Sequence, residues 1–134
     1  MSLQDTMNEM VKEIDGAIGA AVVDLDSGLM LAVAHTVPYF TQTYLDAVAA
    51  AAVEMIRGRN MVAVEEMIST QRGEEVKHTI EEIQMTTAGT YHFMATGKNK
   101  KNILTVLITT RKTNLGMGWA SIRKRLSTIE SEAP

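Results

Sequence analysis

The pattern that comes nearest to known chemistry is a glycine–lysine pair late in the chain. Gly97-Lys98 lies eight residues after Gly89, which resembles the spacing of a loop that cradles phosphate with backbone N–H groups and a lysine. The glycine spacing is nevertheless wrong, and Asn99 stands where such a loop has a magnesium-binding serine or threonine. A β-hairpin rather than a helix is predicted to follow. We therefore interpret 97–102 (GKNKKN) as a hairpin loop, and the chain as not itself a GTPase.

The histidines and serines form no catalytic or metal-binding pattern. His35, His78 and His92 are widely spaced, without a His-x-x-x-His or Glu-x-x-His pair. Ser27 has no Gly-x-Ser-x-Gly context. An enzyme would need His78 or His92 to meet an acidic partner in a cleft. We predict no catalytic residue, no metal ligand and no cofactor site, and hence a protein that is not an enzyme.

The acidic residues are paired along the chain without forming a recognisable site. Glu65-Glu66, Glu74-Glu75 and Glu81-Glu82 lie in segments that we expect to be exposed. Asp24 and Asp26 flank a tight turn and lack the further oxygen ligands of a calcium loop. Solvated surfaces and turn stabilisation are the interpretation that we favour.

Short glycine and basic clusters are the last candidates for binding. Gly116-x-Gly118 opens the last predicted helix, where anions can bind, but we expect these glycines to allow close packing and Trp119 to lie in the core. Lysines crowd 98–101 and basic residues fill 123–125, which we expect to face water. In an otherwise acidic chain these clusters could steer an acidic partner.

Composition restricts the class of protein. The sequence has 134 residues, a net charge of −3 and 46% hydrophobic residues, which predicts one domain over 1–134 with a single core. The acidic balance argues against a nucleic-acid-binding protein. The sequence contains no cysteine, as fits a reducing cytoplasm, and no apolar run is long enough for a membrane span.

The first third of the chain reads as a helix followed by a β-hairpin. Ser2 and Asp5 predict a helix cap, and one apolar stripe follows at helical spacing: Leu3, Met7, Met10, Val11 and Ile14. Residues 17–25 (AIGAAVVDL) are apolar on both faces and predict a central strand. A tight turn over 26–28 leads into a returning strand over 29–34.

The most informative pattern is the long helix predicted over 40–57, which Gly58 ends. It carries two neighbouring apolar stripes, Tyr44, Val48, Ala51 and Met55 beside Leu45, Ala49, Ala52 and Ile56. The solvent stripe is left to Thr43, Asp46, Ala50 and Arg57. A helix on one sheet needs one apolar stripe, so the wider band indicates burial against two surfaces, and another copy of the chain could supply the second.

The second half predicts three strands and a helix. Residues 61–69 are either a further helix or an irregular segment. Residues 77–87 alternate with polar groups on both faces, which predicts an edge strand, and 90–96 with the doubly apolar 103–110 complete the sheet. The last helix carries an apolar stripe, and 130–134 is expected to fray; the stripe consists of Leu115, Trp119, Ile122, Leu126 and Ile129.

Residues 15–32 (DGAIGAAVVDLDSGLMLA) resemble the opening of the roadblock family, named after a dynein light chain: a glycine, a small apolar run, an aspartate, a glycine-ended turn and an apolar return strand. Leu115-Gly116 and the helix after it are similar to the family's closing segment, so the resemblance covers residues 3–129. It implies an α+β, profilin-like domain with a five-stranded antiparallel sheet. The long helix would cover one face, and the two terminal helices the other.

The resemblance also implies function. Family members are non-catalytic platforms that dimerise through the long helix and a sheet edge and bind small Ras-like GTPases, or join motor and signalling complexes. Here the implied homodimer seam comprises Leu45, Val48, Ala49, Ala52, Ile56, His78, Ile80, Glu82 and Gln84, and Ala49→Arg is predicted to break it. The implied GTPase surface comprises Thr43, Asp46 and Arg57. The alternatives are an adaptor subunit and a small-molecule sensor.

Overall fold

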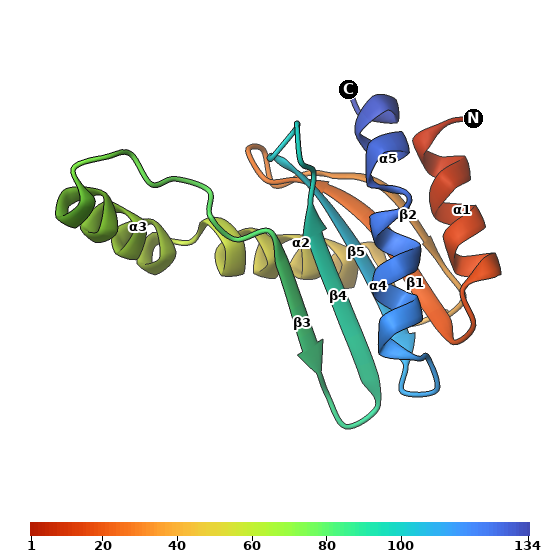
Figure 1. The fold of residues 1–134 in the computed structure, drawn as a ribbon. Helices are drawn as coiled ribbons and strands as arrows, with labels where there is room; N and C mark the ends of the chain where they lie inside the picture. The colour runs from red at the N-terminus through yellow and green to blue at the C-terminus, as the bar shows by residue number, and fades with distance from the viewer.

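The computed structural model describes residues 1–134 and contains five helices and five strands (Figure 1). In chain order these are α1 (Leu3–Glu13), β1 (Ala17–Asp24), β2 (Met30–His35), α2 (Gln42–Arg57), α3 (Arg59–Arg72), β3 (Glu82–Thr86), β4 (Thr90–Thr96), β5 (Ile103–Thr110), α4 (Leu115–Arg123) and α5 (Leu126–Glu132). The predicted element order is confirmed with two additions. Residues 61–69, for which the sequence allows a helix or an irregular segment, lie within α3, and the predicted last helix is divided into α4 and α5.

The five strands form one antiparallel sheet in the order β2-β1-β5-β4-β3. The prediction that 17–25 and 103–110 are central strands is confirmed, because β1 and β5 lie side by side with strands on their other edges. The predicted edge strand is also confirmed as β3, but it is shorter than 77–87. His78 has a φ of 55°, which interrupts an extended backbone, so pairing begins only at Glu82.

One face of the sheet is covered by α1, α4 and α5, which lie together in Figure 1. The predicted cap of α1 is present: the Ser2 hydroxyl accepts from the Asp5 N–H, and the Asp5 carboxylate accepts from the Ser2 N–H. Apolar side chains of the three helices then meet the sheet in one core that includes Met7, Met10, Phe93, Leu107, Ile122 and Ile129. Burial of this apolar surface is the main force that holds the layer on the sheet.

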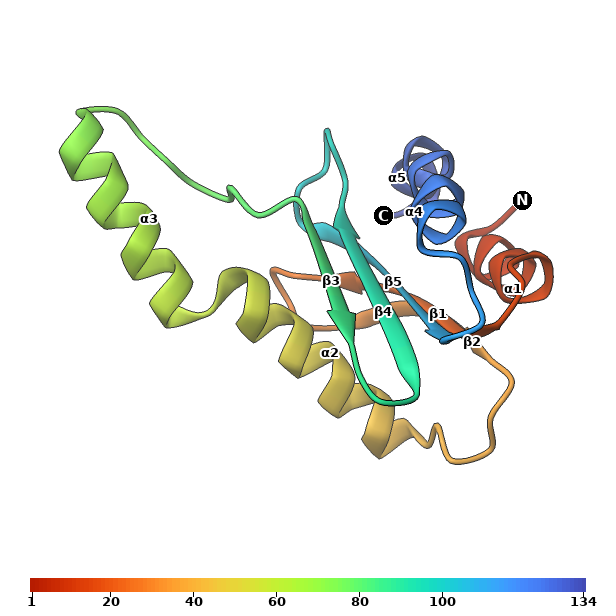
Figure 2. The same cartoon turned by 60° about the horizontal axis from the view of Figure 1, so that its bottom comes forward.

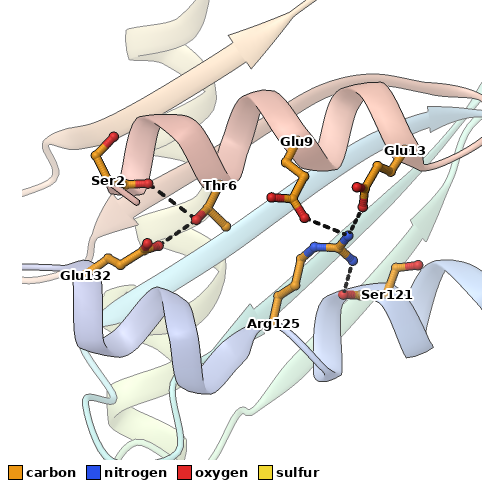
Figure 3. Close-up of polar contacts among 7 residues, drawn as sticks. All are labelled: Ser2, Thr6, Glu9, Glu13, Ser121, Arg125 and Glu132. Atoms are coloured by element: carbon orange, nitrogen blue, oxygen red, sulfur yellow. Dashed lines mark hydrogen bonds and ion pairs between the residues drawn. The ribbon is translucent and has the colours of Figure 1, made fainter.

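Arg125 connects these helices and corrects the prediction that 123–125 faces water. It is buried, its Nη2 donates to Glu13 at 2.6 Å with Glu9 at 3.8 Å, and its Nη1 donates to the Ser121 carbonyl at 3.0 Å (Figure 3). The three acceptors come from α1 and α4, so only the folded chain brings them together.

The C-terminal segment 130–134 is also better ordered than the fraying that its sequence suggested. Helix α5 continues to Glu132, whose carboxylate accepts from the Thr6 hydroxyl of α1 at 2.6 Å (Figure 3), and Ala133 is buried. Leu115, in contrast, was expected in the apolar stripe and is exposed. The helix ends at Arg123 and restarts at Leu126, so one continuous stripe does not describe both halves.

The opposite face of the sheet is covered by α2 alone, as Figure 2 shows. Gly58 ends α2 and precedes α3. The junction requires a glycine, because a Cβ at this position would lie 2.2 Å from the Glu54 carbonyl oxygen. Beyond Gly58, α3 projects away from the sheet (Figures 1 and 2), and its single buried residue is Glu65. None of the helices is both long and apolar enough to cross a bilayer.

The expected packing role of the α4 glycines gives a test at Gly118. A Cβ there would lie 2.6 Å from the fully buried Phe93 ring. We expect Gly118→Ala to lower the free energy of unfolding by about 1–3 kcal/mol, because the core cannot absorb the added methyl without strain. Urea unfolding followed by circular dichroism measures this.

The matched control is Gly89→Ala, where an added Cβ meets nothing within 4 Å. This control is expected to leave stability unchanged or to raise it by up to about 1 kcal/mol. Equal stability of both variants would contradict the packing role of Gly118.

Candidate functional site

The three histidines lie apart and form no site. His35 packs its ring against Phe40 with centroids 5.4 Å apart, and His92 lies half-buried on β4 with Nε2 2.9 Å from the Thr90 hydroxyl. Burial lowers the pKa of His92; burial, followed by the charge of Arg57, lowers that of His78. No group of three or more His, Asp or Glu side chains is placed to hold a metal ion.

The β4–β5 loop holds an anion that belongs to the chain itself. The backbone N–H groups of Lys98, Asn99 and Lys100 donate to the Glu130 carboxylate at 3.1, 2.8 and 2.6 Å. Burial alone would raise the pKa of Glu130, but these three bonds outweigh it and hold the pKa below its ordinary value. The loop whose sequence resembles a phosphate-binding loop therefore anchors the C-terminal helix α5 to the sheet.

The predicted dimer seam on α2 requires correction. Leu45, Ala49, Ala52 and Ile56 are all buried against the chain's own sheet, Ala49 to 1% exposure. The two apolar stripes of α2 are similar in composition, and the rotation of the helix about its own axis determines which of them faces the sheet. Ala49→Arg would therefore disrupt the core of a single chain and cannot report on a dimer.

The second α2 stripe is only partly covered. Val48 and Met55 are half-buried, and Tyr44 and Ala51 are exposed. Between this stripe and β1 and β2 lies an apolar cavity of about 20 Å³. That volume is near the size of one water molecule, whereas small-molecule pockets measure about 300–1,000 Å³. The cavity between the sheet and α2 is thus too small for a metabolite.

The three residues proposed to face a GTPase differ in their surroundings. Thr43 and Asp46 are exposed, as predicted for the solvent stripe. Arg57 is not part of that stripe: its side chain is 12% exposed, donates to the Lys101 carbonyl at 2.9 Å and lies 3.5 Å from Asp26. It ties the end of α2 to the β1–β2 and β4–β5 turns, so it is not free to reach a partner.

Apolar side chains are exposed on both α2 and α3. The exposure of Ala50 was predicted with the solvent stripe, whereas the exposed apolar side chains of α3 were not predicted. The outer side of α2 presents Ala47, Ala50 and Ala51 to solvent. On α3 the large side chains of Val62, Val64 and Met67 are exposed, Met67 to 63%. The sequence signal was an alanine-rich helix followed by apolar residues without one clear stripe. Such a surface is typical of a protein-binding site.

We call residues 59–81, which comprise α3 and the segment that returns from it to β3, the α3 arm. Glu65 was expected to be solvated but is buried, and its carboxylate accepts from the Thr79 N–H at 2.7 Å and hydroxyl at 2.6 Å. The Ser69 hydroxyl accepts from the Val76 N–H at 2.7 Å. These bonds close the arm on itself, away from the sheet.

The β3 edge lies beside the arm. The backbone N–H of Thr96 donates to the Glu81 carbonyl, and that of Thr87 donates to the Thr90 carbonyl, so Glu81 and Thr87 face β4. Because hydrogen-bonded and non-bonded positions alternate along an antiparallel pair, Gln84 directs its own N–H and C=O away from β4. The other predicted edge residues, His78, Ile80 and Glu82, lie before or at the start of β3, where Glu82 accepts two bonds from Arg123 of α4. The edge is therefore open for pairing only over β3.

Comparison with known proteins identifies the fold. No protein-family model and no curated protein matches the sequence. Among solved structures, the chain is similar to the Roadblock/LC7 domain from Streptomyces avermitilis, with a TM-score of 0.71 and 14% identity over 98% of this chain and 97% of that one. It is similar to Myxococcus xanthus MglB at 0.67 and 15%, over 93% and 89%, and to an MglB with tetrameric arrangement at 0.71 and 17%, over 98% and 87%. The resemblance predicted from residues 15–32 is confirmed at the level of the fold.

The bond between Glu65 and Thr79 gives a test of the α3 arm. Burial raises the pKa of Glu65, but the bonds from Thr79 outweigh it and hold the pKa below its ordinary value. We expect Glu65→Ala to open the arm, so that the Thr79 amide exchanges with solvent about tenfold faster or more. Hydrogen exchange followed by mass spectrometry measures this.

Glu66→Ala is the matched control, because the neighbouring glutamate is exposed. In the unaltered chain, the Thr79 amide should be fully protected from exchange above the ordinary pKa of a glutamate. This protection should be lost as the pH falls through the lowered pKa of Glu65. Equal exchange in both variants would show that the Glu65 carboxylate does not hold the arm.

Proposed function

We propose that this chain, which has the roadblock/LC7 fold, is a non-catalytic homodimeric scaffold that binds and regulates a small Ras-like GTPase. The observation that carries the proposal is the exposure of apolar side chains on α2 and on α3, in a chain whose sheet has an unpaired edge at β3. Protein-binding scaffolds need such surfaces, whereas enzymes need a cleft with converging polar groups. The absence of cysteine fits a reducing compartment, and the proposal places the protein in the cytoplasm.

Incomplete cover of the α2 face supports self-association. Ile83 and Met85 of β3 pack against that core but remain only partly buried. A second copy that aligns its β3 with Gln84 and brings its own α2 alongside Ala50 would cover this apolar surface. The solved MglB with tetrameric arrangement is a self-associating protein of the same fold.

A GTPase partner is supported by the resemblance of residues 15–32 to the roadblock family, whose members bind such proteins. Thr43 and Asp46 remain the residues that we propose for contact, because both are exposed on α2. The guanidinium of Arg57 is held by Lys101 and Asp26. Arg57 would therefore not enter the partner's active site, and we propose that regulation reshapes the partner's loops.

An adaptor subunit of a motor or signalling complex is the second candidate, and the α3 arm favours it. The arm projects from the body and exposes Val62, Val64 and Met67, so it offers a further partner an apolar surface away from the sheet. The partner retained by the protein distinguishes the two candidates.

The dimer is tested by Ala50→Arg. We expect this variant to be folded but monomeric at low micromolar concentration, because a buried arginine without a partner costs several kcal/mol in an interface. Sedimentation velocity measures the mass in solution. Ala120→Arg is the matched control, since Ala120 is an exposed helical alanine on the opposite face of the sheet and should leave the dimer intact.

Gln84→Pro tests the sheet edge in the same assay. It removes an N–H that points away from β4, so the chain should fold while edge pairing is lost. Dimers that survive both Ala50→Arg and Gln84→Pro would contradict the proposed seam.

The GTPase is tested by capture. We expect the tagged chain to retain a small GTPase from its native cytosol with a non-hydrolysable GTP analogue and to lose it with GDP. Asp46 lies one helical turn before Ala50, so sedimentation velocity first establishes that Asp46→Lys is dimeric. The dimeric variant should then reduce the retained amount at least tenfold. Glu54→Lys, a charge reversal elsewhere on the exposed side of α2, is the control. Retention of a motor or kinase assembly without any GTPase would favour the adaptor.

A further inference from the structure

The other edge strand of the sheet, β2, pairs with no further strand, and a side chain bonds its backbone instead. The Gln4 amide of α1 donates from Nε2 to the Val33 carbonyl at 2.7 Å, and its Oε1 accepts from the Val33 N–H at 3.3 Å. One amide thus donates to and accepts from the backbone of one residue, as a residue in an added strand would. No backbone segment of the chain covers this edge.

The register indicates which further backbone groups point outward. The Thr36 N–H donates to the Ile18 carbonyl across the β1–β2 pair, so Thr36 faces β1. By the antiparallel alternation, His35 and Val33 both direct their N–H and C=O away from β1. The β2 edge therefore presents the backbone N–H and C=O groups of Val33 and His35 to a partner strand. Gln4 bonds only those of Val33.

The surroundings of this edge are apolar on the α2 side and more polar on the α1 side. Tyr39 is 63% exposed and Tyr44 is 39% exposed, and both pack against Phe40, with centroids 5.3 and 4.9 Å apart. On the α1 side an open depression of about 360 Å³ is lined by Asn8, Val11, Val33, Ala34 and His35. Exposed aromatic side chains beside an unpaired edge are favourable for binding a peptide.

We propose that the β2 edge binds an extended peptide whose side chains alternate between apolar and polar. The peptide backbone displaces Gln4 and pairs with Val33 and His35. Its apolar side chains contact Tyr39 and Tyr44, and its polar side chains face the Asn8 depression. Displacement costs about one net hydrogen bond, because Gln4 is exposed and its amide keeps its bond to Asn8, 3.1 Å away. The site is distinct from the β3 edge, so a dimer could bind one peptide per chain.

The test uses the full chain and a soluble probe peptide in which valine alternates with threonine, with a lysine at each end. Isothermal titration measures the affinity, and two-dimensional NMR locates the perturbed amides. The control probe carries methyl groups on alternate backbone nitrogens, so that charge and composition are kept while strand pairing is blocked. We expect the control to bind at least tenfold more weakly, and the probe to perturb residues 31–36.

Two variants decide the role of the edge. Gln4→Ala removes the competing amide and should tighten binding about fivefold, the value of one net hydrogen bond. Val33→Pro removes an outward N–H, which an edge strand tolerates, and should weaken binding at least tenfold. Equal binding of both probes, perturbation confined to residues 82–86, or an affinity that Gln4→Ala leaves unchanged or weakens would each overturn the proposal. If Val33→Pro does not fold, the control probe and Gln4→Ala still decide it.

Discussion

The structure depends on one constraint: its two central strands are apolar on both faces, so both faces of the sheet require cover. Helices α1, α4 and α5 supply a full layer on one side, with Met7, Met10, Phe93 and Ile122 completely or almost completely excluded from water. Helix α2 alone supplies the other layer, and the next helix leaves the sheet instead of extending it. The partly buried side chains of β3 and the exposed alanines of α2 follow from this imbalance, which makes association the natural way to complete the core.

Carboxylates hold the peripheral elements in place. Glu130 fixes the C-terminal helix to the β4–β5 loop through three backbone N–H groups, and Glu65 closes the α3 arm through Thr79. Glu13 with Glu9 receives the buried Arg125 between α1 and the last two helices. Each carboxylate accepts bonds from donors, and the guanidinium donates to acceptors, as charged groups removed from water require. Acidic residues that look solvated in sequence therefore act as clamps between segments far apart in the chain.

The two edges of the sheet are treated differently, and this difference organises the proposed interactions. The β2 edge is engaged by the Gln4 amide at Val33, whereas β3 leaves Gln84 directed outward beside the α3 arm. Unpaired edges are liabilities unless they are covered or used. The surfaces that the chain leaves unpaired or uncovered are the two sheet edges and one helix face. A scaffold that assembles with itself and with other proteins is consistent with all three.

The sequence by itself determined the periodic elements, because alternation and helical spacing are local properties: both central strands, the capped α1, the long α2 that Gly58 ends, and the position of one edge strand. It also predicted that α2 is buried against two surfaces, of which the chain's own sheet supplies one. Only the tertiary structure decided which of two equivalent stripes meets the sheet, and it chose the one that contains Ala49, against the predicted seam. It likewise decided that Arg57, Arg125 and Glu65 are held inside. Charged residues are placed by partners that lie far away along the chain, and no local pattern contains that information.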